Sequence, residues 1–238
     1  MQDNNQEFLN LYSELENHLK NFYNMYSSKS IIVYHIDHLK KSYLAFDKNR
    51  ANIIDKIRTL RNFLIHEADI IGGDSFTINQ ELIDFLKKEI VRIENPRVAY
   101  DVCTKKREMV YAEISDSLKS IVNLMIQNGY SHIPVLDKMG VLIGVFSSNV
   151  LLSYVYSNNN VILDDKATIA DFLNYLNISS HFTECYQFVK KNTRFEKLVE
   201  IFNQKKINNK RLVMLLVTNN GYEDEEILGI ITLYDVIK

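Results

Sequence analysis

The sequence predicts an α+β protein in which an N-terminal α-helical bundle is followed by an α/β module of two pseudo-symmetric repeats. Glycine is absent before Gly72 and proline before Pro96, so the first part of the chain lacks the turn residues typical of a β domain. Helical apolar stripes fill that part, and one strand-and-helix pattern occurs twice after it. We therefore expect a bundle over residues 1–95, a first repeat over 97–160 and a second repeat over 161–238.

Apolar residues at helical spacing predict four helices in the bundle, because residues three and four apart share one helix face. The third helix is expected to end at Gly72-Gly73, Thr77 to cap the fourth, and Asn95-Pro96 to end it. Short loops between such helices are typical of an α-bundle. The four stripes are Phe8, Leu11, Tyr12, Leu15, Leu19 and Phe22; Ile36, Leu39, Tyr43 and Phe46; Ile53, Ile54, Ile57, Leu60 and Leu64; and Leu82, Phe85, Leu86, Ile90 and Ile93.

The internal repeat is clearest in two segments, GVLIGVFSSNVLL (140–152) and EILGIITLYDVIK (226–238). Each has an apolar strand around a glycine, then a hydroxyl residue, then the start of a helix. The segments VAYDV (98–102) and IADFL (169–173) also resemble each other. Two strand–helix–strand–strand–helix units bury their apolar faces against each other, and the crevice between them is a natural ligand site. The helix before each pair of strands carries one stripe, at Leu118, Ile121, Val122 and Met125 and at Phe195, Leu198, Val199 and Phe202.

The composition limits the classes of function. The chain has 46% hydrophobic and 24% charged residues, as in globular proteins, and its net charge of −2 gives no general attraction to nucleic acid. Cys103 and Cys185 lie far apart without ligand spacing, so we expect neither a disulfide nor a metal site. The first residues, MQDNNQEFLN, are not those of a signal peptide, and no apolar run reaches the roughly 20 residues that cross a bilayer. We expect a cytoplasmic protein without membrane contact.

Thr232 and Asp235 are the strongest candidate ligand-binding residues. A hydroxyl at a strand-to-helix junction is placed to bind phosphate beside helix N-terminal amides. A carboxylate in the first helical turn can accept both hydroxyls of a ribose. The alternative interpretation is that Asp235 only caps its helix, because acidic residues favour first turns.

The second half of the chain resembles the CBS domain, a family whose members occur in tandem pairs called Bateman modules. The resemblance covers about residues 97–238. It implies a regulatory adenine nucleotide (AMP, ADP, ATP or cyclic di-AMP), with Thr232 at the phosphate and Asp235 at the ribose. The residues that carry it are GYSHIPVLD (129–137), Gly140, LIGV (142–145), Ser147 and LGIITLYD (228–235).

The same resemblance implies that the acid of one repeat faces the base-binding segment of the other. Asp235 would then face the segment from Gly129 onward, where backbone groups read the adenine edge and Tyr130 or Ile133 packs on its face. In the first repeat Val150 replaces the acid, and the segment KRLVMLL (210–216) that it would face lacks the proline. We therefore expect one working site per chain. The candidate base-binding residues are Tyr130, Ser131, His132, Ile133 and Pro134, with His132 either near phosphate or structural.

The third predicted helix contains LRNFLIHE (60–67), in which Arg61, Asn62 and His66 resemble the R-[NHD]-x(3)-H motif of HEPN domains. HEPN domains are small α-bundles that often cleave RNA without metal. The resemblance implies that His66 moves a proton, Arg61 stabilises phosphate charge and Asn62 orients the imidazole. Arg61 and His66 are five positions apart and point in different directions on a helix. Activity would thus require a homodimer in which two motifs share one cleft.

A structural role for this motif is the alternative. Arg61 could pair with Glu67 or a neighbouring helix, and His66 could lie in a core or interface. A basic set on the bundle could follow an RNA backbone or be only a solvated face; it comprises Lys40, Lys41, Lys48, Arg50, Lys56 and Arg58.

Three functions fit the sequence. The first is a regulatory protein in which an adenine nucleotide on the CBS pair controls a HEPN-like effector. The second is an enzyme, a nucleotide-gated, dimeric, metal-independent ribonuclease. The third is a non-catalytic dimerisation and docking protein, which predicts no response to small molecules.

Overall fold

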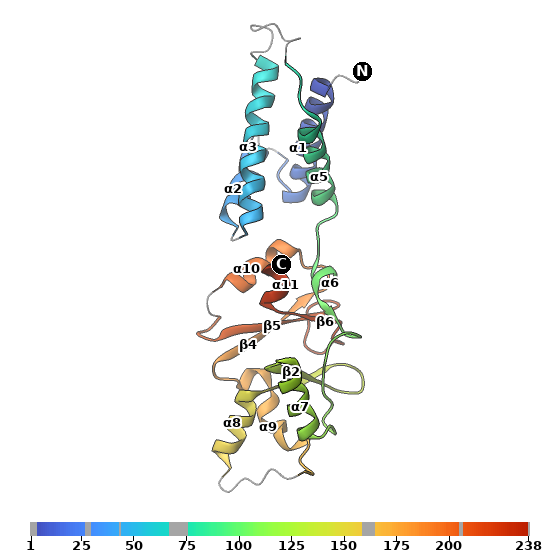
Figure 1. Ribbon diagram of the computed structural model, residues 1–238, viewed down its shortest axis with the longest axis vertical. Helices are drawn as coiled ribbons and strands as arrows, with labels where there is room; N and C mark the ends of the chain where they lie inside the picture. The colour runs from blue at the N-terminus through green and yellow to red at the C-terminus, as the bar shows by residue number, and fades with distance from the viewer. Residues whose placement is uncertain are drawn as a thin grey trace. The chain divides into compact units, whose positions relative to one another are not determined.

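A computed structural model describes residues 4–26, 30–42, 44–66, 76–158, 165–204 and 207–237 (Figure 1). The chain divides into two compact units, Met1–Arg97 and Val98–Lys238. The division falls directly after Pro96 and Arg97, next to the proline at which the sequence predicts a boundary.

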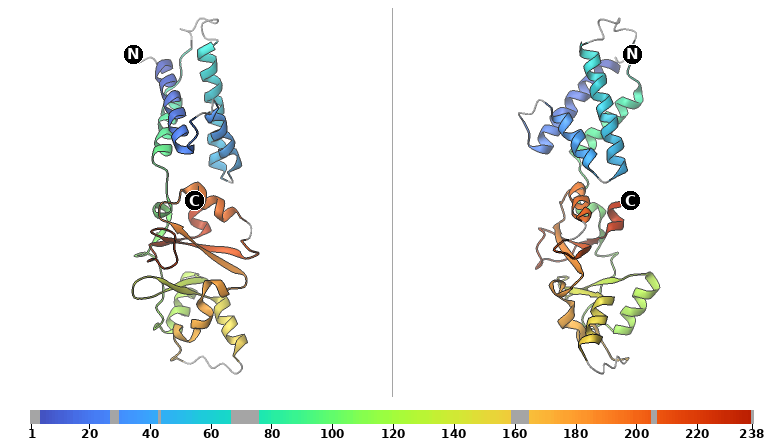
Figure 2. Two further views of the ribbon diagram at one scale, coloured as in Figure 1. Left: turned by 180° about the vertical axis from the view of Figure 1, so that it is seen from behind. Right: turned by 90° about the vertical axis from the view of Figure 1, so that its left-hand side faces the viewer.

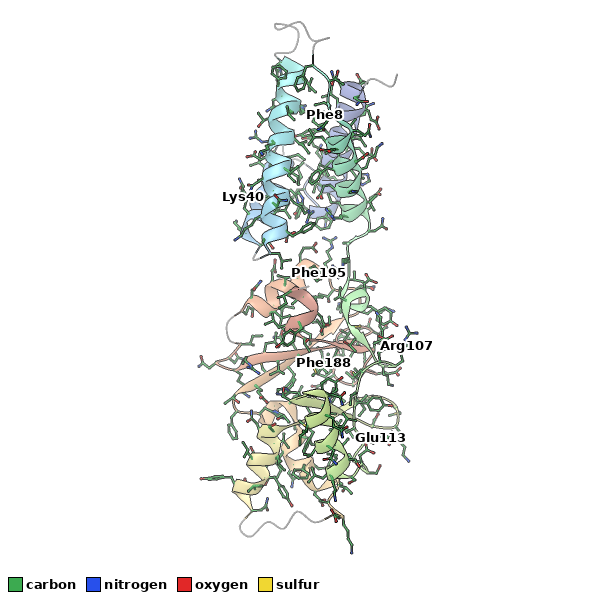
Figure 3. The ribbon with its side chains drawn as sticks, in the orientation of Figure 1. Phe8, Lys40, Arg107, Glu113, Phe188 and Phe195 are labelled. Carbon is green, nitrogen blue, oxygen red and sulfur yellow. The ribbon has the colours of Figure 1, made fainter. Side chains whose placement is uncertain are left out.

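The described part of the first unit has four helices, α1 (Asn4–Tyr23), α2 (Ile31–Lys41), α3 (Ala45–His66) and α5 (Gln80–Glu94). Helix α1 packs along α5, and α2 packs along α3. Phe8 lies inside this bundle, fully buried, while Lys40 lies exposed on α2 (Figure 3). The predicted stripe of α1 faces the core, with Phe8, Tyr12, Leu15 and Leu19 all buried.

Two details of the bundle differ from the sequence-based prediction. The second helix ends at Lys41, and Phe46 lies in α3 with 55% of its surface exposed, where its ring packs against the guanidinium groups of Arg50 and Arg92. Asn79, rather than Thr77, caps α5, because its side-chain oxygen accepts a hydrogen bond from the Leu82 N–H at 3.1 Å. The predicted helix stop at Gly72-Gly73 and Tyr43 lie outside the described residues.

A buried ion network joins α3 to α5. The guanidinium of Arg50 donates from Nε and Nη2 to the carboxylate of Glu89, at 3.0 Å and 2.6 Å to Oε2, and from Nη1 to Asp47 at 2.9 Å. Arg92 also donates to Glu89. Arg50 therefore does not belong to a solvated basic face, which corrects the RNA-contacting set proposed from the sequence.

The described part of the second unit has two β-sheets. One has four strands in the order β1-β6-β5-β4, in which β4 and β5 are parallel and the other pairs antiparallel. The other is the antiparallel hairpin β2-β3. The elements in chain order are α6 (Ala99–Val102), β1 (Thr104–Lys105), α7 (Leu118–Asn128), β2 (His132–Leu136), β3 (Leu142–Ser147), α8 (Ser148–Ser157), the 3-10 helix Ile169–Phe172, α9 (Leu173–Leu176), the 3-10 turn Ile178–Ser180, β4 (Glu184–Lys190), α10 (Phe195–Asn203), β5 (Arg211–Thr218), β6 (Gly229–Ile231) and α11 (Leu233–Ile237).

The two sheets face each other, and helices cover their outer sides, with α6, α10 and α11 on one sheet and α7, α8 and α9 on the other (Figures 1 and 2). Between the sheets lies a shared core that draws on both repeats, with Leu136 and Val145 from the hairpin and Tyr186, Met214 and Leu216 from the four-stranded sheet. The apolar faces of the two sheets are therefore buried against each other.

The leading segment of each repeat packs on the other repeat. The core that contains Ile121 and Phe146 of the first repeat also contains three buried residues of the second repeat, Ile169, Phe172 and Leu176. Strand β1, from the first repeat, pairs with β6 of the second. The packing therefore crosses the boundary that the sequence places near residue 160.

Two glycines allow the leading segment of each repeat to pack on the other repeat, because its backbone passes directly over them. A Cβ atom at Gly144 would lie 2.1 Å from the carbonyl oxygen of Leu176, and one at Gly229 would lie 2.5 Å from that of Thr104. Any side chain at either position would collide with main-chain atoms. This close approach explains why both repeats carry glycine at the same place.

Candidate functional site

Thr232 and Asp235 meet at the junction between β6 and α11. The Thr232 N–H donates to Asp235 Oδ2 at 2.7 Å, and the Thr232 hydroxyl donates to the same oxygen at 2.8 Å. Asp235 thus caps α11, as the alternative interpretation of the sequence has it. Its other oxygen, Oδ1, makes no hydrogen bond to any described residue, so the carboxylate retains an acceptor for a ligand.

The side chain of Thr232 belongs to the face of β6 that borders the space between the sheets. Ile230 packs against the shared inter-sheet core, and alternation along a strand places Thr232 on the same face. Thr104 lies directly opposite Ile230 in the antiparallel register. It adds a second hydroxyl to this face, which sequence reasoning missed because β1 is too short to show a pattern.

Two cationic side chains lie in and shortly after β1, and neither was predicted. Lys105 follows Thr104, with its Nζ 3.7 Å from Cys103 Sγ and 3.5 Å from the centre of the Tyr100 ring. Burial raises the pKa of Cys103, and the nearby charge of Asp235 acts in the same direction. The charges of Lys105 and Asp235 therefore both act on one buried thiol.

Arg107 is the second of these cations. Ala112 pairs in parallel with Val135, which lies opposite Gly144. Val189 pairs in parallel with Val217, which lies opposite Gly229. Ala112 and Val189 are therefore equivalent positions of the two repeats. Arg107 and Glu184 each lie five residues before these positions. Arg107 is 83% exposed and extends from the surface of the second unit (Figure 3).

The predicted base-binding segment divides between two environments. Tyr130 is 44% exposed and lines a cavity of about 320 Å³ between α7 and α8, together with Met125, Phe146 and Leu151. Ile133 is buried in the core of the first repeat, so its side chain cannot pack on a base, which corrects that part of the prediction. No hydrogen bond or ion pair among the described residues joins Thr232 or Asp235 to residues 130–134.

Pro134 and His132 lie on the opposite face of β2 from Ile133. Pro134 pairs with Val145, which belongs to the inter-sheet core, and His132 pairs with Ser147. This face of β2 and the Thr232 face of β6 therefore border the same inter-sheet space. Ser131 remains exposed, with its hydroxyl 2.8 Å from His132 Nδ1.

The imidazole of His132 is directed toward the second repeat. Its Nε2 lies 3.0 Å from Glu184 Oε1, close enough for an ion pair but not aligned for a hydrogen bond. The ring also packs edge-on near Tyr186. His132 is therefore held by protein groups, as in the structural alternative, rather than free to contact phosphate.

The first repeat lacks the counterpart of the Thr232–Asp235 pair. Ser147 is buried and accepts a long hydrogen bond from the Val150 N–H at 3.4 Å. Val150 itself is buried in the core of the first repeat. Glu184 lies beside this junction and accepts a hydrogen bond from Asn149 at 2.8 Å.

The candidate ribonuclease residues lie at the end of α3. Arg61 packs over the ring of Tyr12 at 5.6 Å and donates to Asn62 Oδ1 at 3.3 Å. Asn62 and His66 are exposed. The amide of Asn62 thus contacts Arg61, and no hydrogen bond within the described residues joins Asn62 or Arg61 to His66. Glu67, the predicted partner of Arg61, lies outside those residues.

None of the helices in the described ranges is long and apolar enough to cross a membrane. Over the same ranges, no group of three or more histidine, cysteine, aspartate and glutamate side chains is arranged to hold a metal ion.

Comparison with known proteins identifies the first repeat. Residues 99–157 match the family model of the CBS domain. This part of the chain is therefore similar to a CBS domain. The matched range runs from α6 through α8, so it contains the hairpin β2-β3 and the segment from Tyr130 to Pro134. No curated protein matches the chain.

Solved CBS structures are similar to part of the chain. A CBS domain-containing protein of unknown function from Bacillus anthracis is 18% identical, with a TM-score of 0.41, over 59% of this chain and 89% of that one. The CBS domain of a bacterial CNNM/CorC family Mg2+ transporter, in complex with ATP, is 22% identical, with a TM-score of 0.41, over 62% and 89%. CBSX2 in complex with AMP is 18% identical, with a TM-score of 0.41, over 59% and 92%. At these values the similarity assigns no ligand to this chain.

Proposed function

We propose that residues 98–237 form a pair of CBS repeats that binds one adenine nucleotide per chain, and that the protein is a nucleotide-responsive regulator. The observation that carries this proposal is the Thr232–Asp235 pair at the edge of the inter-sheet space, with one carboxylate oxygen unused by the described residues. The CBS-domain match of the first repeat supports it.

The pair can exchange its internal hydrogen bond for contacts to a nucleotide. The Thr232 hydroxyl has one proton, which it donates to Asp235 in the structure. Turning that proton toward a phosphate oxygen releases Asp235 Oδ2 from the hydroxyl, and both carboxylate oxygens can then accept from ribose hydroxyls. Thr104 adds a donor on the same face, and Lys105 and Arg107 add positive charge near the cleft.

We further propose that the protein acts as a homodimer. Helix α8 carries exposed apolar side chains at Leu152, Val155 and Tyr156, and α7 adds Ile126, which is 73% exposed. Apolar side chains gathered on two neighbouring helices favour contact with a second copy. The bundle, in this proposal a HEPN-like effector, would respond to nucleotide through a difference in affinity between two arrangements of the dimer.

A thermal-shift panel with AMP, ADP, ATP and cyclic di-AMP, with GTP as the control, tests the proposal. A ligand at a hundredfold excess over its Kd stabilises the folded state by about 2.7 kcal/mol. For a protein of this size that corresponds to a rise in Tm of roughly 5–10 °C. We expect such a rise with at least one adenine nucleotide and none with GTP. No response to any of them would favour the docking protein.

A nucleotide-gated ribonuclease is the second candidate, favoured by the exposure of Asn62 and His66 on α3. Arg61→Ala and His66→Ala are each expected to abolish cleavage of single-stranded RNA. The first removes the group proposed to stabilise the phosphate charge, and the second removes the group proposed to transfer the proton. Asn52→Ala, an exposed change on the same helix outside the basic set, serves as the control. Cleavage that persists in both variants, or that EDTA stops, contradicts this mechanism.

A further inference from the structure

The carboxylate of Glu184 is surrounded by donors from both repeats. Asn149 Nδ2 donates to its Oε1 at 2.8 Å, and the Tyr186 hydroxyl donates to its Oε2 at 3.3 Å. The imidazoles of His132 and His181 lie 3.0 Å and 3.5 Å from the two oxygens. The Glu184 side chain is only 10% exposed, so these contacts replace water around the anion.

Burial alone would raise the pKa of Glu184, but the nearby imidazoles of His132 and His181 outweigh it, and the pKa is lowered. The surroundings therefore favour a negative charge. His181 has a second ring nitrogen, Nε2, that is buried without a hydrogen-bond partner among the described residues. The side chains around Glu184 therefore include a ring nitrogen that the carboxylate does not engage.

This anion occupies the cleft equivalent to the proposed nucleotide site. Its donor Asn149 lies between Ser147 and Val150, which correspond to Thr232 and Asp235 of the other repeat. The position of Glu184 itself corresponds to Arg107 in the first repeat. The first repeat therefore has an exposed cation at the position where the second repeat has a buried anion.

We propose that Glu184 is a built-in anion that fills the second cleft, so that this cleft excludes phosphate and accepts a small carboxylate or phosphate only when the Glu184 side chain is removed. Phosphate placed beside an ionised Glu184 would be repelled and would compete for the same donors. Val150 offers no acceptor for a ribose. The inference deepens the proposed function, because it names the residue that limits each chain to one nucleotide.

The test uses Glu184→Ala in the full-length protein. In chloride buffer, loss of the carboxylate leaves buried donors unpaired, and we expect a Tm roughly 10 °C below wild type. Sodium acetate or inorganic phosphate, at constant ionic strength, should then raise this Tm saturably while leaving wild type unchanged. If the variant does not fold in chloride, refolding in acetate or phosphate should recover it.

Two matched variants make the result specific. Glu184→Gln keeps the cleft filled and should not respond to acetate, and Glu200→Ala removes an exposed carboxylate paired with Lys197 and should change neither Tm nor anion response. Absence of anion stabilisation or recovery in Glu184→Ala overturns the proposal, as does an equal response in Glu184→Gln.

A nucleotide titration separates this proposal from the proposed function. Wild type is expected to bind one nucleotide per chain. Two per chain would overturn the exclusion by Glu184 while supporting nucleotide binding. If wild type binds none, the proposed function fails, and the acetate and phosphate results still decide whether Glu184 fills an anion site.

Discussion

Asp235→Ala is expected to weaken binding of the adenine nucleotide by roughly 10–100-fold, because a hydrogen bond to a charged group contributes about 1.5–3 kcal/mol. In the structure, Asp235 directs one oxygen to Thr232 and leaves the other unused by the described residues. The proposed ribose contact depends on that carboxylate. Isothermal titration calorimetry of the variant and the wild type measures the change in Kd.

Asp235→Ala removes the cap of α11 as well as the proposed ribose contact, so a second variant must separate these two effects. Asp235→Asn keeps a side-chain oxygen that can accept from the Thr232 N–H, so it should retain the helix cap and lose the charge. We expect Asp235→Asn to melt near wild type and to bind nucleotide weakly, and Asp224→Ala, in an exposed loop, to bind normally. Unchanged affinity in both Asp235 variants would refute this site.

Glu89→Ala is expected to destabilise the helical bundle by about 3–5 kcal/mol, because it leaves a buried guanidinium without its partner. The Glu89 side chain is 0% exposed and receives hydrogen bonds from Arg50 and Arg92. Asp47 accepts from Arg50 Nη1 alone, so the loss of Glu89 leaves Nε and Nη2 without their acceptor. Differential scanning calorimetry of the full chain should show the loss in the transition of the first unit.

Two further variants show whether the stability lost in Glu89→Ala comes from an unpaired buried charge or only from the loss of a salt bridge. The triple variant Asp47→Asn/Arg50→Leu/Glu89→Leu removes all three buried charges and should recover much of the lost stability, because uncharged residues of similar size often replace a buried ion network without loss. Glu200→Ala breaks an exposed pair with Lys197 and should cost no more than about 1 kcal/mol. A similar effect of Glu89→Ala and Glu200→Ala would mean that the network contributes little.

The helices and the repeat were predictable because they depend on periodicity. The stripe from Phe8 to Leu19 lies on the buried face of α1, and Gly144 and Gly229 mark equivalent close approaches. Alternation along β2 could also have shown that Ile133 and His132 point to opposite faces. The cap at Asn79 was missed because Thr77, two residues earlier, has the same capping chemistry.

The buried polar clusters were not predictable, since their members are far apart in the sequence. Arg50 and Glu89 come from different helices, and His132 and Glu184 from different repeats. Nothing in the local sequence distinguishes Arg50 from the exposed lysines around it. The same holds for the exchanged leading segments, because the pairing of β1 with β6 joins the start of one repeat to the end of the other.

A crystal structure of the chain with the adenine nucleotide that gives the largest thermal shift tests the central claim most directly. The account predicts one nucleotide per chain, with ribose hydroxyls on the Asp235 carboxylate, a phosphate oxygen on the Thr232 hydroxyl, and Glu184 still in the second cleft. A nucleotide in the second cleft, or one bound away from Thr232 and Asp235, would contradict it.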